Sequence, residues 1–128
     1  MKLSLGKKER LKSKKLIELL FKEGKYIKEY PIKLLYLEAD NNSDFPVNVA
    51  FTVPKRNFKK AVERNRLKRL LRETYRKEKP RLYKSLNKSY IFMFILMGNE
   101  SVEYKILEKS MNSLLSSLIK KLTDEKNY

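Results

Sequence analysis

The chain of 128 residues contains no cysteine, no histidine and no tryptophan. Without cysteine it can form neither a disulfide framework nor a thiolate zinc site. Without histidine it lacks the commonest general base and the commonest metal ligand, so Ser-His-Asp and Cys-His catalytic sites are excluded. A protein with this inventory is a poor candidate for acid–base cleavage of a substrate on its own.

Long apolar runs are also scarce. The longest one, residues 90–97, is far shorter than the roughly 20 residues that span a bilayer. The N-terminal stretch MKLSLGKKERLKSKK lacks the apolar core of a signal peptide. We therefore expect a cytoplasmic protein with a single domain over residues 1–128. Within it, residues 1–12 form a basic arm and residues 123–128 a tail, both candidates for disorder.

Acidic residues are few, since 15 Asp and Glu stand against 31 Lys and Arg, which gives a net charge of +16. So large a charge repels itself in the compact state, and a polyanionic partner would offset that cost. Nucleic acid is the first candidate partner, and an anionic membrane surface is the second. The charge is concentrated in residues 1–28 (net +7) and 55–81 (net +10), so we expect these segments to come together as one binding surface.

Apolar periodicity and turn residues predict an α+β domain. We expect a first helix from the cap candidate Ser13 to Gly24, with the glycine in the left-handed conformation. Short apolar runs predict strands at residues 32–37 and 47–53, separated by the turn-forming segment DNNSD. A further strand fits either around residues 25–30 or in a split of the 32–37 region.

The second half of the chain predicts two helices and another strand. The stretch AVERNRLKRLLRETYRK, residues 61–77, predicts a helix, and we place Pro80 beyond its end. The run 90–97 predicts a central strand that is buried on both faces and closed by Gly98. A last helix, with Ser101 as candidate cap, has core positions at Leu107, Met111, Leu114, Leu115, Leu118 and Leu122.

The helix over residues 61–77 has two opposite faces. At 100° per residue, one arc carries Arg64, Asn65, Lys68, Arg69, Arg72 and Arg76. The opposite arc is apolar and carries Leu67, Leu70 and Leu71, while Arg66 lies apart from the basic arc, beside Glu73. The basic arc contains no acid at the i, i+4 positions, unlike an ordinary solvated face. Arginine suits bidentate phosphate contacts and asparagine can reach a base edge or a 2′-hydroxyl, so the pattern favours a polyanion-binding surface.

The segment AVERNRLKRLLRE closely resembles the bacterial ribonuclease P protein subunit. The family signature is Ala-Val, any residue, Arg-Asn-Arg, an aliphatic residue, Lys-Arg and a following Arg. Here it corresponds to Ala61-Val62, Arg64-Asn65-Arg66, Leu67, Lys68-Arg69 and Arg72. RLKSKKLIELLFKEGK resembles the family's N-terminal helix, and VAFTVPKR resembles its strand leading into a basic turn. The resemblance extends over most of the chain, from Arg10 to Leu122.

This resemblance implies a small two-layer α+β sandwich with a sheet of about four strands, three helices and a left-handed βαβ crossover around the signature helix. It also implies the protein subunit of an endoribonuclease, ribonuclease P, which pairs with a large catalytic RNA. The subunit would bind the single-stranded 5′ leader of precursor tRNA and assist its removal. The catalytic groups and the Mg²⁺ ions are then expected on the RNA, with no catalytic or metal site on the protein and no DNA or membrane partner.

Carried over by position, the family signature implies RNA binding by six residues of this helix. We add three cations of the loop that precedes the helix. The helix residues are Arg64, Asn65, Arg66, Lys68, Arg69 and Arg72, and the loop cations are Lys55, Arg56 and Lys60. For the leader cleft, Phe21 matches an aromatic of the first helix, and Ile17 and Leu35 stand where the family often has Phe and Tyr. Phe21 could also belong to the core, which is the more ordinary place for Leu35. Tyr26, Tyr36 and Tyr75 could each line a cleft.

Three other functions are compatible with a basic α+β domain. An RNA-binding module of the ribosomal-protein type would have no role in cleavage, and reconstitution with a catalytic RNA would distinguish it. A membrane-surface protein would place Trp or Phe at the boundary of its apolar and basic faces, but the chain has no Trp. A protein-only nuclease needs clustered carboxylates for metal ions, whereas the acidic pairs Glu38/Asp40 and Asp124/Glu125 fall near a turn and in the tail.

Overall fold

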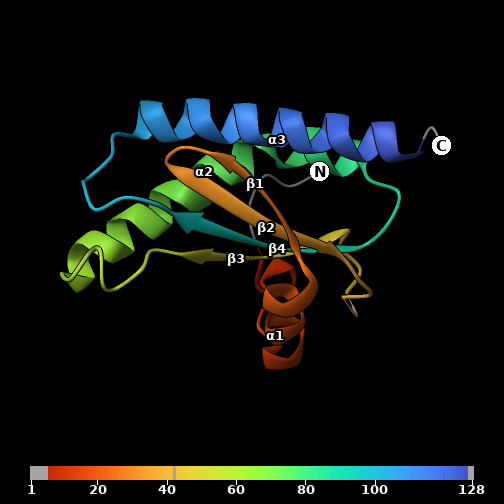
Figure 1. Ribbon diagram of the computed structural model, residues 1–128, viewed down its shortest axis with the longest axis horizontal. Helices are drawn as coiled ribbons and strands as arrows, with labels where there is room; N and C mark the ends of the chain where they lie inside the picture. Colours follow the sequence, from red (N-terminus) through yellow and green to blue (C-terminus); the bar gives the residue numbers. More distant parts are fainter. Residues whose placement is uncertain (1–5, 42, 127–128) are drawn as a thin grey trace.

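The computed structural model describes residues 6–41 and 43–126 (Figure 1). Its elements are η1 (Lys7–Glu9), α1 (Lys14–Glu23), β1 (Lys25–Glu29), β2 (Ile32–Glu38), β3 (Val47–Thr52), α2 (Ala61–Ser85), β4 (Tyr90–Leu96) and α3 (Tyr104–Lys126). The strands form one sheet in the order β1-β2-β4-β3, in which β3 is parallel to β4 and the other pairs are antiparallel. The predicted α+β class is confirmed, and the strand left open near residues 25–30 is β1.

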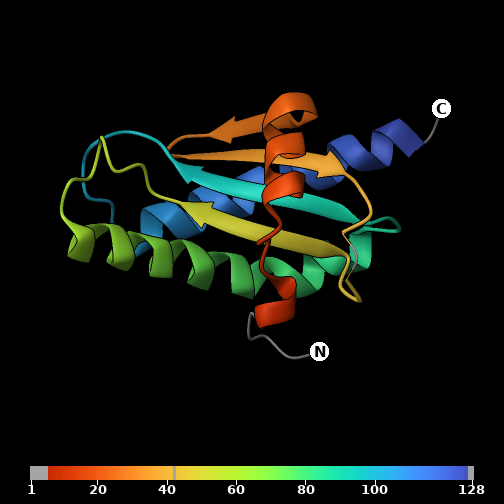
Figure 2. The ribbon, with the colours of Figure 1, turned by 90° about the horizontal axis from the view of Figure 1, so that it is seen from below.

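Helices cover both faces of this sheet (Figures 1 and 2). α2 and α3 lie side by side on one face, where all six core positions predicted for the last helix are buried. α1 crosses the opposite face, and its Leu20 packs against Ile91 and Met93 of β4. Phe92 and Phe94, which alternate with them, are buried in the core under α2 and α3. The prediction of a central strand buried on both faces is therefore confirmed.

The segment β3–α2–β4 forms a left-handed crossover (Figure 2). β3 and β4 are parallel neighbours, and α2 joins them over the face that lies away from α1. Connections of this kind are right-handed in nearly all proteins, so this one is a specific feature that the family resemblance implies. As a result, α2 begins at the end of the sheet where β3 and β4 finish, and its N-terminal half is reached directly from the basic loop 53–60.

The two ends of α1 are defined by different interactions. Ser13 caps the N-terminus as predicted, because its Oγ accepts a hydrogen bond of 3.2 Å from the Leu16 amide. The prediction for Gly24 is wrong in its reason, since Gly24 has φ −68° and not a left-handed conformation. A Cβ at this position would lie 2.3 Å from the Leu20 carbonyl oxygen, so the close approach of the chain to its own last turn requires glycine.

α2 is longer than its sequence predicts. The helix continues to Ser85 with Pro80 inside it, so the placement of Pro80 beyond the helix end is wrong. A proline in a helix interior removes one backbone hydrogen bond and costs about 3 kcal/mol. The segment after it nevertheless stays helical because Leu82 is fully buried in the core and Tyr83 packs against that core. Burial of these two side chains offsets the local penalty.

Candidate nucleic-acid interface

The N-terminal half of α2 presents the predicted basic arc on its outer surface. Leu67 and Leu71 are fully buried against the sheet, which fixes the rotation of the helix. Asn65 and Arg69 are exposed, and Lys68 and Arg72 are half-buried beside them. Among the described residues, no carboxylate forms an ion pair with Lys68, Arg69 or Arg72. These cations are therefore available to an external anion.

Arg64 belongs to the same arc but is also held by the protein. Its guanidinium donates hydrogen bonds to the backbone carbonyls of Phe58 (2.8 Å) and Lys59 (2.9 Å). The Phe58 side chain is buried in the core. The loop before α2 is therefore attached to the domain at two points, the Phe58 ring and the hydrogen bonds from Arg64. Arg64 thus fixes the loop that carries Lys55, Arg56 and Lys60.

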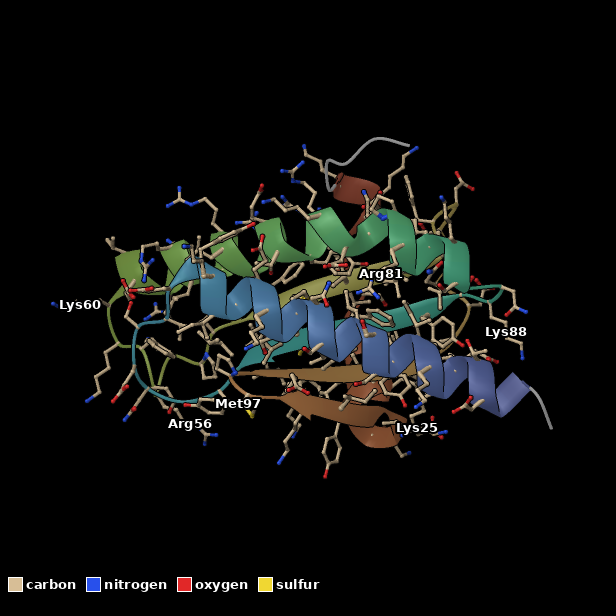
Figure 3. All side chains as sticks on the ribbon, turned by 90° about the horizontal axis from the view of Figure 1, so that it is seen from above. Lys25, Arg56, Lys60, Arg81, Lys88 and Met97 are labelled. Carbon is tan, nitrogen blue, oxygen red and sulfur yellow. The ribbon has the colours of Figure 1, made fainter. Side chains whose placement is uncertain are left out.

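The three loop cations lie where the sheet, the loop and α2 meet. Lys55, Arg56 and Lys60 are all exposed. Figure 3 shows Arg56 and Lys60 at the same end of the molecule as Met97, which follows β4, and far from Lys25 and Lys88. The structure therefore places the loop cations next to the start of α2, and their role in RNA binding stays a prediction.

Arg66 is engaged in a different network, on the side of α2 that faces α3. It donates hydrogen bonds to both oxygens of the Glu63 carboxylate (3.2 and 2.9 Å) and to Ser101 Oγ (2.6 Å). Ser101 in turn donates to Glu63 (2.7 Å), and α3 begins only at Tyr104, so the prediction that Ser101 caps the last helix is wrong. Hydrogen bonds from Arg66, and then from Ser101, lower the pKa of Glu63 from 4.5 to about 2. Arg66 accordingly joins α2 to the segment before α3.

Arg76 differs from the other cations of the basic arc. It forms an ion pair with Glu73, three residues earlier on α2. The helical wheel instead places Glu73 beside Arg66. The hydrogen bonds from Arg76 lower the pKa of the Glu73 carboxyl. The i, i+4 positions of this arc contain no acid, as predicted, but Glu73 pairs with Arg76 at i, i+3 from outside the arc. Among the described residues, the cations of the arc without a carboxylate partner are therefore those of the first three turns.

Residues 7–12 of the predicted basic arm lie against α2 and β3, whereas residues 1–5 fall outside the described part of the chain. The Lys79 ammonium lies 3.0 and 2.9 Å from the two carboxylate oxygens of Glu9, and both side chains are buried. The Leu11 amide donates to the Val49 carbonyl of β3 (2.9 Å), and Leu11 is itself buried. The structure thus brings the two basic segments of the sequence together. The sequence feature that could have predicted the contact with Lys79 is Glu9, the single acid among the first 17 residues.

The residues predicted for the leader cleft lie on the sheet face crossed by α1. Phe21 is 61% exposed and does not belong to the core, whereas Ile17 and Leu35 are half-buried against Leu20 and Met93. Ile17 and Phe21 are one turn apart and so share one flank of α1. Leu20, the residue before Phe21, faces the sheet. In a right-handed helix that runs toward β1, the side chain after Leu20 points along the sheet toward the end that carries the β1–β2 turn. α1 does not cross this end of the sheet (Figure 2).

We call the surface formed by Ile17, Phe21, Tyr26, Leu35 and Ile95 the α1-side surface. Tyr26 is 56% exposed there, while Tyr36 and Tyr75 are buried on the other side of the sheet. The surface is open to solvent. The hollow of about 400 Å³ that borders α1 lies elsewhere and is lined by Lys15, Leu16, Glu18, Leu19 and Lys22.

Residues 6–41 and 43–126 lack the features of a metal centre and of a membrane-spanning helix. No group of three or more acidic residues is placed to hold a metal ion within these ranges. Over the same ranges, none of the helices combines the length and the apolar character needed to cross a bilayer.

Comparisons with known proteins agree with each other. The family model described as Ribonuclease P matches residues 5–119. The chain is 32% identical over 114 residues to the "Ribonuclease P protein component" of Porphyromonas gingivalis, covering 87% of this chain and 83% of that protein. It is 48% identical over 83 residues to the protein of the same name from Chlorobium phaeobacteroides, covering 62% and 57%. The solved RNase P protein from Thermotoga maritima is similar with a TM-score of 0.64 and 27% identity, over 84% of this chain and 96% of that one.

Proposed function

The chain belongs to the ribonuclease P protein family, and from this membership we propose that it binds the single-stranded 5′ leader of precursor tRNA on its α1-side surface. As a protein component of ribonuclease P, it is part of a complex whose partner is the ribonuclease P RNA. We further propose that the outer face of α2, with Asn65, Lys68, Arg69 and Arg72, contacts that RNA.

The observation that supports leader binding is the exposed Phe21 beside an uncovered part of the sheet. A phenylalanine that is 61% exposed contributes little to the core, but its ring offers a stacking surface for an unpaired base. The loop cations Arg56 and Lys60 lie at the end of the sheet toward which this flank of α1 faces. Single-stranded RNA is commonly bound by such a combination of aromatic platforms and backbone-contacting cations.

The side chains of the protein support a division of chemistry in which the RNA carries the reacting groups. The chain has no histidine and no cysteine, and its described residues form no cluster of carboxylates suited to a metal ion. We propose that the RNA subunit and the substrate hold the Mg²⁺ ions and the reacting groups, and that the protein contributes binding and positioning. Two-metal phosphodiester hydrolysis needs several ordered oxygen ligands, which RNA phosphates can supply.

The test is reconstitution with a bacterial ribonuclease P RNA at low Mg²⁺ concentration, with cleavage of precursor tRNA as the readout. We expect the protein to stimulate cleavage and to tighten substrate binding only when a leader is present. Phe21→Ala should weaken binding of the leader-carrying substrate by about 5- to 100-fold, the range for loss of one base–aromatic stack. Ile106→Ala, which removes an exposed apolar side chain from α3, is the matched control.

The surface of α2 is tested by its salt dependence. Replacing one phosphate-contacting cation should reduce the slope of log affinity against log salt by about 0.7 to 0.9. We expect this change for Arg69→Ala in binding of the ribonuclease P RNA, and no change for Lys120→Ala on α3. Absence of stimulation by the wild-type protein would contradict the proposed function, and an unchanged slope for Arg69→Ala would contradict the role of α2.

A further inference from the structure

The register between β1 and β2 places Tyr26 on the α1-side surface. Tyr26 of β1 is paired with Leu35 of β2, and paired residues point to the same face of a sheet. The next residue, Ile27, points the other way and packs against the core under α2 and α3. The Tyr26 ring is therefore on the face crossed by α1, directly beside Leu35, with more than half of its surface exposed.

Two lysines flank this ring. Lys28 and Lys33 are paired across β1 and β2, one position further along the same face. Their ammonium nitrogens lie 5.5 Å and 4.7 Å from the centre of the Tyr26 ring. Like charges directly opposite each other destabilise a strand pair. Within the part of the chain that the structure describes, neither ammonium forms an ion pair with a carboxylate. An external anion between the two ammonium groups would relieve this repulsion.

We propose that Tyr26, Lys28 and Lys33 form a binding site for one nucleotide of single-stranded RNA. The base stacks on the Tyr26 ring, and the phosphate lies between the two ammonium groups. This inference rests on the proposed function, because the nucleotide belongs to the leader that Phe21 also contacts. It assigns a ligand to the β1 part of the α1-side surface, where the Tyr26 ring is an aromatic platform next to the aliphatic Leu35. An exposed cation–π contact is weak, so a phosphate can draw the lysines from the ring at small cost.

The first experiment measures the affinity of the reconstituted ribonucleoprotein for two substrates, a precursor tRNA with a long leader and one with a single leader nucleotide. Tyr26→Ala should weaken binding of the long-leader substrate by about 5- to 100-fold and leave the short-leader substrate unchanged. Tyr26→Phe should keep the wild-type affinity, because it keeps the ring. Ile106→Ala is the matched control, since Ile106 is 52% exposed and belongs to α3, on the opposite face of the sheet.

The second experiment locates the stacked base. Abasic nucleotides are introduced one at a time along the leader, and each substrate is bound by the wild-type and the Tyr26→Ala enzyme. At the position that stacks on Tyr26, base removal should weaken wild-type binding but add nothing to the loss caused by Tyr26→Ala. The double variant Lys28→Gln/Lys33→Gln should lower the salt dependence of long-leader binding.

Different results would overturn different conclusions. If the wild-type enzyme prefers the long leader and Tyr26→Ala binds it equally well, the nucleotide site is wrong and the proposed leader binding stands. The same holds if abasic and Tyr26→Ala losses are additive at every leader position. If the wild-type protein gives no leader-dependent affinity at all, leader binding and the Tyr26 site are both wrong.

Discussion

Replacement of Glu9 by glutamine tests how residues 7–12 are attached to α2. The Glu9–Lys79 pair has oxygen–nitrogen distances of 2.9 and 3.0 Å, with side chains that are 5% and 1% exposed. Glutamine keeps the volume and removes the charge, so the Lys79 ammonium stays buried without its carboxylate. Removing one partner of a buried ion pair costs about 3–5 kcal/mol. We expect a loss of that size in the free energy of unfolding, which corresponds to a decrease in Tm of about 10–20 °C.

Urea denaturation of the free protein, in a buffer that contains sulfate, measures this loss. Glu73→Gln is the control, because Glu73 also pairs with an arginine on α2 but in a partly exposed position, where such pairs contribute about 0–1 kcal/mol. The double variant Glu9→Gln/Lys79→Met removes both charges and should recover most of the stability. If Glu9→Gln destabilises the protein no more than Glu73→Gln does, the buried pair does not hold the N-terminal segment in place.

Three further predictions concern α2. Arg69→Ala should weaken binding of the ribonuclease P RNA with no change in unfolding free energy, whereas Arg64→Ala should in addition cost about 1–2 kcal/mol, because two loop carbonyls lose their donor. RNA titrations and urea denaturation of both variants check this, and equal stabilities would contradict it. Pro80→Ala should stabilise the protein by up to about 3 kcal/mol by restoring a helix hydrogen bond, and a thermal melt without any gain would contradict that reasoning. The pKa of Glu63 is lowered to about 2 by hydrogen bonds from Arg66, so its contribution to stability is complete above pH 4.5 and is lost as the pH falls toward 2. Wild-type stability should therefore fall more steeply over that range than the stability of Glu63→Gln, and parallel curves would show that Glu63 is not involved.

Regular patterns of apolar residues predicted the elements that the core depends on. The run 90–97 contains the central strand β4, and the helical spacing from Leu107 to Leu122 places every predicted core position of α3 in the interior. Leu67 and Leu71 likewise predicted which side of α2 faces the sheet, and hence which cations face outward. Such patterns are reliable because burial of an entire face decides the orientation of an element.

Local signals were misleading where a tertiary contact outweighs them. Pro80 is an ordinary helix terminator, but burial of Leu82 keeps α2 helical beyond it. Ser101 has the composition of a cap, yet its hydroxyl is used by Glu63, which is 38 residues away in the sequence. A helical wheel contains no information about such partners. For the same reason it could not distinguish Arg69 from Arg64, which lies on the same arc but donates its guanidinium hydrogen bonds to the carbonyls of Phe58 and Lys59.

The contact between residues 10–11 and β3 has a consequence for self-association. An open sheet has two edge strands, and their unpaired backbone groups can recruit a strand from another molecule. Here β1 forms one edge and carries lysines at 25 and 28, while Arg10 forms a bridge with Val49 on the other edge. The N-terminal segment therefore shields part of the β3 edge with its own backbone. Deletion of residues 1–12 would remove cations and would also open this part of the β3 edge to pairing with a strand of another molecule.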